Sequence, residues 1–165
     1  MRTVTQGVII QTKKFAMLGL IAAGVLTGML VAEAKDTVPY HSVISGQAVI
    51  NPDTGAILST EEAGIGTHIG KFTLSGVADA DGVIWFTVTA ANGDKLFGVV
   101  VGASPSGEEI YLLIYDGTGR FEGATGDITA SITIDPNPVS LNPVTLAYKG
   151  TGTGTISTVG SNKKE

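Results

Sequence analysis

After residue 40 the chain alternates between two kinds of segment. Short runs rich in Val, Ile, Thr, Phe and Tyr recur roughly every 8 to 14 residues, separated by clusters of Gly, Asn, Asp and Pro. This pattern is typical of an antiparallel sandwich or barrel. Sustained helical periodicity is absent there, apart from one short helical turn expected within 56–64. We predict about eight strands: 43–50, 66–77, 83–91, 95–102, 109–115, 127–135, 144–149 and 151–158.

Glycine favours a barrel over a sandwich. Many of the 23 glycines fall inside the strand-like runs, including Gly46, Gly98 and Gly152. Glycine weakens a flat sheet but permits bulges and tight curvature, which a small closed barrel needs. Asn92-Gly93 is a hairpin signal because both residues tolerate positive φ. The sequence therefore predicts an all-β fold, a small closed antiparallel barrel.

Two of the predicted strands are apolar on both faces. In 95–102 and 109–115, consecutive large apolar residues leave neither face polar. A strand of this kind must be covered on both sides. The outer cover is either a second subunit, which makes the protein a homo-oligomer through strands 95–115, or a loop or the C-terminal tail of the same chain.

The N-terminal segment has the pattern of a secretory signal peptide. Arg2, Lys13 and Lys14 precede an uncharged apolar run over 15–32, and Ala32-Glu33-Ala34 matches a cleavage site. We expect cleavage after Ala34, which divides the chain into a signal peptide at 1–34 and one barrel domain at 35–165. The mature protein is then secreted or periplasmic and has no membrane span. An uncleaved membrane anchor is the alternative, because the apolar run reaches the lower limit for a span.

Charge and cysteine content exclude several function classes. The net charge is −5, which argues against nucleic acid and anionic membrane surfaces as partners. Without cysteine there is no disulfide, no thiol nucleophile and no bacterial lipid anchor. His41 and His68 are not spaced as a metal site, and 79–82 begins like a calcium loop but lacks the later ligands. We expect no metal and no cofactor.

Three segments carry a resemblance to a known group. They are Gly66-Thr67-His68-Ile69-Gly70-Lys71-Phe72, then residues 89–94, and then the glycine-rich stretch GTGRFEGATG at 117–126. In this combination and order the chain resembles exported bacterial proteins of the allene oxide cyclase barrel-like group. The last segment is also similar to a stretch of plant dirigent proteins.

The resemblance implies a fold more than a function. It implies an eight-stranded antiparallel barrel, often trimeric, over about residues 42–158. Allene oxide cyclases cyclise an unstable lipid-derived epoxide and dirigent proteins steer phenoxy-radical coupling, and both hold an apolar substrate in the barrel. Their polar active-site residues find no secure match here, so the catalytic residues are unknown.

Four residues are candidates for contact with a ligand. His68 shares a face with Phe72 by alternation, so it either points into the barrel or is a structural histidine near the barrel end. Tyr111 and Tyr148 either line a pocket or pack in the core or an interface. Arg120 either binds a ligand carboxylate at the rim or pairs with Glu122 or another nearby acid.

These patterns leave three hypotheses for the function. The protein binds a small apolar molecule in its lumen without catalysis, or it is a cyclase, isomerase or dirigent-like protein acting on a reactive apolar substrate. The third possibility is a structural cell-envelope protein with a filled barrel. The volume of the lumen separates the first two hypotheses from the third.

Overall fold

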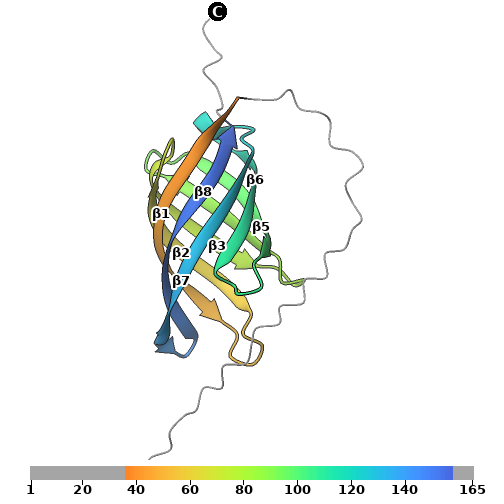
Figure 1. The fold of residues 1–165 in the computed structure, drawn as a ribbon, viewed down its shortest axis with the longest axis vertical. Coiled ribbons are helices and arrows are strands. Elements are labelled where there is room, and N and C mark those ends of the chain that lie inside the picture. Colours follow the sequence, from red (N-terminus) through yellow and green to blue (C-terminus); the bar gives the residue numbers. More distant parts are fainter. Residues whose placement is uncertain (1–35, 158–165) are drawn as a thin grey trace, which may run out of the picture.

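The computed structural model describes residues 36–157, and these form one closed antiparallel barrel (Figure 1). Each strand pairs with the next along the chain, and the first pairs with the last over its whole length. The predicted closed barrel of about eight strands is therefore confirmed. The strands are β1 (Thr37–Ile50), β2 (Ile57–Gly66), β3 (Gly70–Ala78), β4 (Ile84–Ala90), β5 (Lys95–Ala103), β6 (Glu109–Gly117), β7 (Gly126–Leu141) and β8 (Val144–Ser157).

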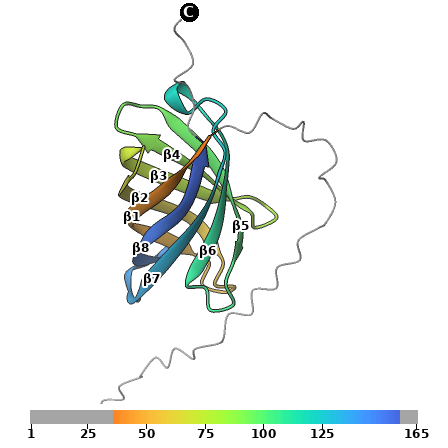
Figure 2. The same ribbon diagram turned by 45° about the horizontal axis from the view of Figure 1, so that its top comes forward.

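The two ends of the barrel differ. At the upper end of Figure 1 lie the start of β1, the end of β8 and the three-residue 3-10 turn η1 (Gly119–Phe121). The turns β1–β2, β3–β4, β5–β6 and β7–β8 lie at the opposite end, which we call the lower end. Figure 2 shows the strands inclined to the barrel axis, as closure of a sheet requires.

Alternation divides every strand between the lumen and the outside. The core consists of inward-facing residues, and those nearer the upper end are buried: Tyr40, Ile44, Phe72, Val88, Leu96, Ile114 and Ile156. Phe121 of η1 joins this core at 6% exposure. A fold with all its strands in one barrel has no sheet edge left to pair with another chain.

The strand count agrees with the prediction only because two errors cancel. The predicted strand 66–77 is in fact the end of β2, a turn, and β3, whereas 144–149 and 151–158 are one continuous β8. The turn forms because His68 and Gly70 have φ of 65° and 77°, which strands do not allow. Gly150 does not interrupt β8, since it pairs with Ile44 and Ile132 on either side.

Two further expectations were wrong. Residues 56–64 form most of β2 rather than a helical turn. The strand predicted to end at residue 135 continues as β7 to Leu141, and its register with β8 shifts between Ile134 and Pro138 because proline cannot donate to the ladder.

The signal peptide predicted at 1–34 lies outside the described residues. Within 36–157, the structure has no helix with the length and apolarity needed to cross a membrane.

Candidate functional site

The barrel lumen is tightly filled in its upper half. A cavity of about 30 Å³ remains at its centre, a volume that accommodates about one water molecule. Its walls are mainly apolar, with Phe72, Phe86 and Ile128 among them. Three polar side chains also reach it: Tyr40, Ser42 and Glu62.

Glu62 is an acidic residue on the inner wall of the barrel, and Tyr148 is its partner. The hydroxyl of Tyr148 donates a hydrogen bond to Glu62 Oε1 at 2.5 Å. The two residues come from β2 and β8, which are not neighbours, because β1 lies between them. Both lie directly opposite Gly46 of β1. Tyr148, Gly46 and Glu62 therefore lie side by side on three neighbouring strands of the inner wall.

Gly46 makes this hydrogen bond possible. A Cβ at position 46 would clash first with the backbone oxygen of Glu61 and would also lie 2.7 Å from Glu62 Cγ, closer than carbon atoms approach one another. The missing side chain leaves a gap over β1 through which the side chains from either side meet. A glycine inside a strand weakens the sheet. At position 46 this cost is offset because the missing side chain lets the side chains of Glu62 and Tyr148 approach each other.

Burial sets the protonation of the pair. Burial raises the pKa of Glu62, although the hydrogen bond from Tyr148 opposes this shift. Burial also raises the pKa of Tyr148, and the negative charge of Glu62 raises it further. Burial is also the main cause that raises the pKa of Tyr40. All three groups therefore favour their neutral forms more than they would in water.

Below this pair the lumen is apolar and more open. Several inward-facing side chains there are only half-buried, in contrast to the buried residues above them, although Ala48 of β1 is buried. We call this region the lower lumen, and its wall includes Ile84, Val100, Ile110, Ile132 and Leu146. An apolar recess with a few polar groups at one end is the usual form of a small-molecule site in a barrel.

Of the four residues predicted to contact a ligand, only Tyr148 faces the lumen. His68 is exposed in the β2–β3 turn rather than on the inner wall, because the chain turns there instead of continuing as a strand. Tyr111 lies on the outer face of β6, since alternation places Ile110 and Leu112 inside. Ligand binding by these residues stays a prediction.

Arg120 closes the upper end of the barrel. Its Nη2 donates to the carbonyl oxygen of Ile69 at 2.8 Å, and its Nε lies 3.7 Å from Asp94 Oδ2. The guanidinium also lies over the Phe121 ring, 4.6 Å from the ring centre. Arg120 thus links η1 to the β2–β3 and β4–β5 turns. Of the two roles predicted for it, the structure favours pairing with a nearby acid, which is Asp94 rather than Glu122.

Sequence reasoning missed Glu62. A signal was present: in 57–66 the inward positions hold Thr60, Glu62 and two glycines, whereas Ile65 faces outwards at 61% exposure. Polar residues inside and an apolar residue outside invert the usual pattern, so β2 did not resemble a strand. An alternation that appears inverted can therefore mark an acidic residue that faces a lumen.

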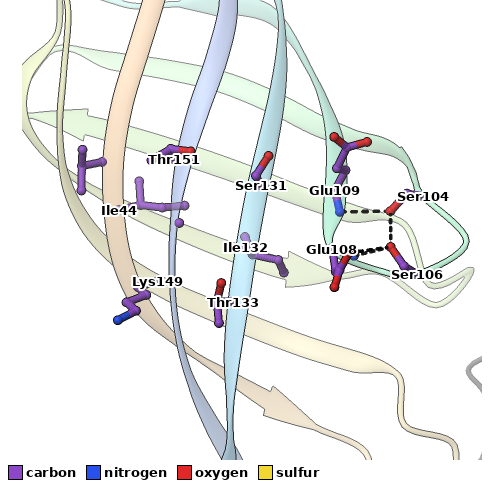
Figure 3. Close-up of a pocket in the computed structure, with 12 residues that line it drawn as sticks. Ile44, Ser104, Ser106, Glu108, Glu109, Ser131, Ile132, Thr133, Lys149 and Thr151 are labelled. Carbon is purple, nitrogen blue, oxygen red and sulfur yellow. Dashed lines mark hydrogen bonds between the residues drawn. The ribbon is translucent and has the colours of Figure 1, made fainter.

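A second hollow lies on the outside of the barrel. This outer groove has a volume of about 690 Å³ and is formed by β1, β8 and β7 together with the β5–β6 hairpin. Figure 3 shows Ser131, Thr133 and Lys149 on the strands, with Glu108 and Glu109 opposite them on the hairpin.

The residues at 36–157 contain no cluster of His, Asp or Glu that could hold a metal ion. No family model matches the chain, and no curated protein matches it. Among solved structures the chain is similar to a pterocarpan synthase dirigent protein, with 13% identity and a TM-score of 0.42 over 81% of this chain and 91% of the other. No residue role is transferred at this level of likeness. Bacterial origin and a link to allene oxide cyclases stay predictions.

Proposed function

We propose that this protein binds a small, largely apolar molecule in its lower lumen, with Glu62 and Tyr148 as the polar anchor. The observation that carries the proposal is the Glu62–Tyr148 hydrogen bond on the inner wall, next to half-buried apolar side chains of the lower lumen. A carboxyl group is costly to bury without a purpose, and perturbed acids in clefts concentrate at functional sites.

The surroundings of the anchor define the ligand. Apolar side chains dominate the lower lumen, so the ligand buries mainly carbon there. Near Glu62 and Tyr148 it carries a hydrogen-bonding group such as a hydroxyl, a carbonyl or an N–H. An anionic ligand is disfavoured, because the charge of Glu62 would oppose it. The central cavity of about 30 Å³ is too small for a ligand, so the molecule stays in the lower half.

Catalysis by the same pair is the second candidate. A carboxyl group with a raised pKa is a suitable general acid, and Tyr148 is within hydrogen-bond distance to stabilise its ionised form. This would suit a cyclase, isomerase or dirigent-like reaction of an apolar substrate. The filled upper lumen favours the third candidate, a structural envelope protein. Ligand binding in the lower lumen is what distinguishes the first two from the third.

The test uses N-phenyl-1-naphthylamine, an uncharged apolar dye with one N–H group whose fluorescence rises on transfer from water. We expect the wild-type protein to bind it. Leu146→Trp fills the lower lumen and should abolish binding, whereas Ala147→Trp, on the outer face of the same strand, is the matched control and should not. Binding that survives Leu146→Trp would contradict the proposal.

The polar anchor is tested separately with the same dye. Glu62→Gln and Tyr148→Phe each remove part of the anchor, and each should weaken binding by roughly 2- to 10-fold, the value of one hydrogen bond. Glu61→Gln is the control, because Glu61 is exposed on the outer face of the same strand. Equal effects of Glu61→Gln and Glu62→Gln would show that the anchor plays no part.

We also propose self-association through the outer face of β5 and β6. Tyr115 of β6 is 45% exposed there and forms an edge-to-face pair, with ring centres 6.0 Å apart, with Trp85 of the neighbouring part of the wall, β4, which is 48% exposed. Large exposed aromatic residues are frequent at protein interfaces. We further propose that the protein is exported and cleaved after Ala34. The mass of the protein recovered from its native host tests this cleavage, because it would remove residues 1–34.

A further inference from the structure

We propose that the outer groove is a second binding site and that its ligand is a neutral oligosaccharide. This inference goes beyond the proposed function and does not depend on it, because the residues that carry it, such as Ser131, Thr133 and Thr151, face outwards, while Ile44 and Ile132 add apolar surface to the groove (Figure 3). Its volume of about 690 Å³ is within the range of ligand sites, about 300–1,000 Å³.

The floor of the groove is an array of hydroxyl groups. Ser131 and Thr133 face outwards from β7, and Thr151 faces outwards from β8 directly opposite Ser131. Outward positions repeat every second residue along a strand, and neighbouring strands are about 4.7–4.9 Å apart, so the hydroxyl groups form a regular grid. Each one both donates and accepts hydrogen bonds, as do the hydroxyl groups of a sugar.

The groove has an acidic wall on one side. Glu109 of β6 lies opposite Ser131, and Glu108 precedes it. A carboxylate accepts hydrogen bonds from two adjacent hydroxyl groups, which is the arrangement that neighbouring sugar hydroxyls offer. Because one cation, Lys149, faces two carboxylates, the groove disfavours anions such as phosphate.

The opposite side supplies a donor and an apolar surface. Lys149 lies on β8 opposite Thr133, two residues from Thr151. Its ammonium group donates to ligand oxygens. Val43 lies opposite Thr151 on β1 and is 66% exposed, so it offers a contact for the C–H face of a sugar ring.

The acidic wall is held in place before any ligand arrives. The amide N–H of Glu109 donates to Ser104 Oγ at 3.0 Å, and the Tyr111 hydroxyl donates to Glu109 Oε2 at 3.4 Å. Ser106 Oγ donates to Glu108 Oε2 at 3.3 Å. Ser104 and Ser106 are themselves 3.2 Å apart (Figure 3). A preformed wall reduces the entropy cost of ordering side chains on binding.

The experiment is a titration followed by amide NMR spectra of the mature protein, with chitotriose, cellotriose and maltotriose as probes at millimolar concentration. We expect saturable shifts with at least one probe, at the amides of Ser131, Thr133, Lys149 and Thr151. Thr151→Val keeps the shape of the side chain but removes its hydroxyl group, and it should weaken that binding by roughly 2- to 10-fold.

Thr153→Val is the matched control, because Thr153 is the next outward residue of β8 and does not line the groove. It should leave the affinity unchanged. Three results would overturn the proposal: no saturable shift with any of the three sugars, shifts confined to residues outside the groove, or equal loss of affinity in both variants. Saturable binding of inorganic phosphate without sugar binding would also overturn it.

Discussion

Phe121 closes the upper end of the lumen, and its replacement by alanine is the most informative change for stability. The ring is 6% exposed and belongs to the core cluster, and Arg120 covers it from the outside. Transfer of a phenyl side chain out of water contributes about 1.5–3 kcal/mol. The cavity that its removal leaves raises the total cost to about 3–5 kcal/mol.

Urea denaturation of the protein measures this loss. With a slope of about 2 kcal/mol per M, the midpoint of Phe121→Ala should fall by roughly 2 M. Phe97→Ala is the control, since Phe97 is half-buried on the outer face of β5. It should lose roughly 1–2 kcal/mol.

A change of no more than about 0.5 kcal/mol in the free energy of unfolding of Phe121→Ala, the range of ordinary surface substitutions, would contradict this prediction. That result would mean that the ring does not plug the barrel. An equal loss in Phe97→Ala would also count against it, because the two rings would then be buried to the same degree.

Three further predictions concern the lumen and the outer face. Gly46→Ala places a Cβ against the backbone oxygen of Glu61 and 2.7 Å from Glu62 Cγ, so it should cost about 1–3 kcal/mol in urea denaturation and weaken dye binding. Because burial raises the pKa of Glu62, the carboxyl group in the folded protein keeps its proton at pH values above the unfolded pKa of about 4.3. Stability from this group is therefore present at low pH and is lost as pH rises through the folded pKa. The free energy of unfolding, measured across this pH range, should decline in the wild type and not in Glu62→Gln. The same decline in both proteins would refute the assignment of this pH dependence to Glu62. Trp85→Lys should convert an oligomer into a monomer by light scattering, whereas a wild-type monomer would refute self-association.

The barrel itself was predictable because its physical causes are local. Alternation in 83–91 and 127–135, glycine within strands and the Asn92-Gly93 turn all depend on neighbouring residues. The β2 strand was not recognised, because its polar residues face inwards and its pattern is set by contacts with β1 and β8. The break at His68 was missed for a related reason, since a positive φ outside glycine is not evident from alternation.

The candidate site was much less predictable. Tyr148 was identified as one of several tyrosines, but its partner was not, because 86 positions separate Tyr148 from Glu62. Their contact depends on barrel closure and on the absence of a side chain at Gly46. The glycine-rich stretch at 117–126 was prominent in the sequence, yet its role is to position Phe121 and Arg120 at the upper end. Prominent motifs here specify the fold, and the polar pair in the lumen has no motif.

The most direct test of ligand binding in the lower lumen is a methyl NMR titration of isoleucine-labelled protein with N-phenyl-1-naphthylamine. Our account predicts saturable shifts at Ile84, Ile110 and Ile132, with no change at Ile156 in the upper core or at Ile65 on the outer face. Shifts confined to Ile65, or no shift at all, would contradict it.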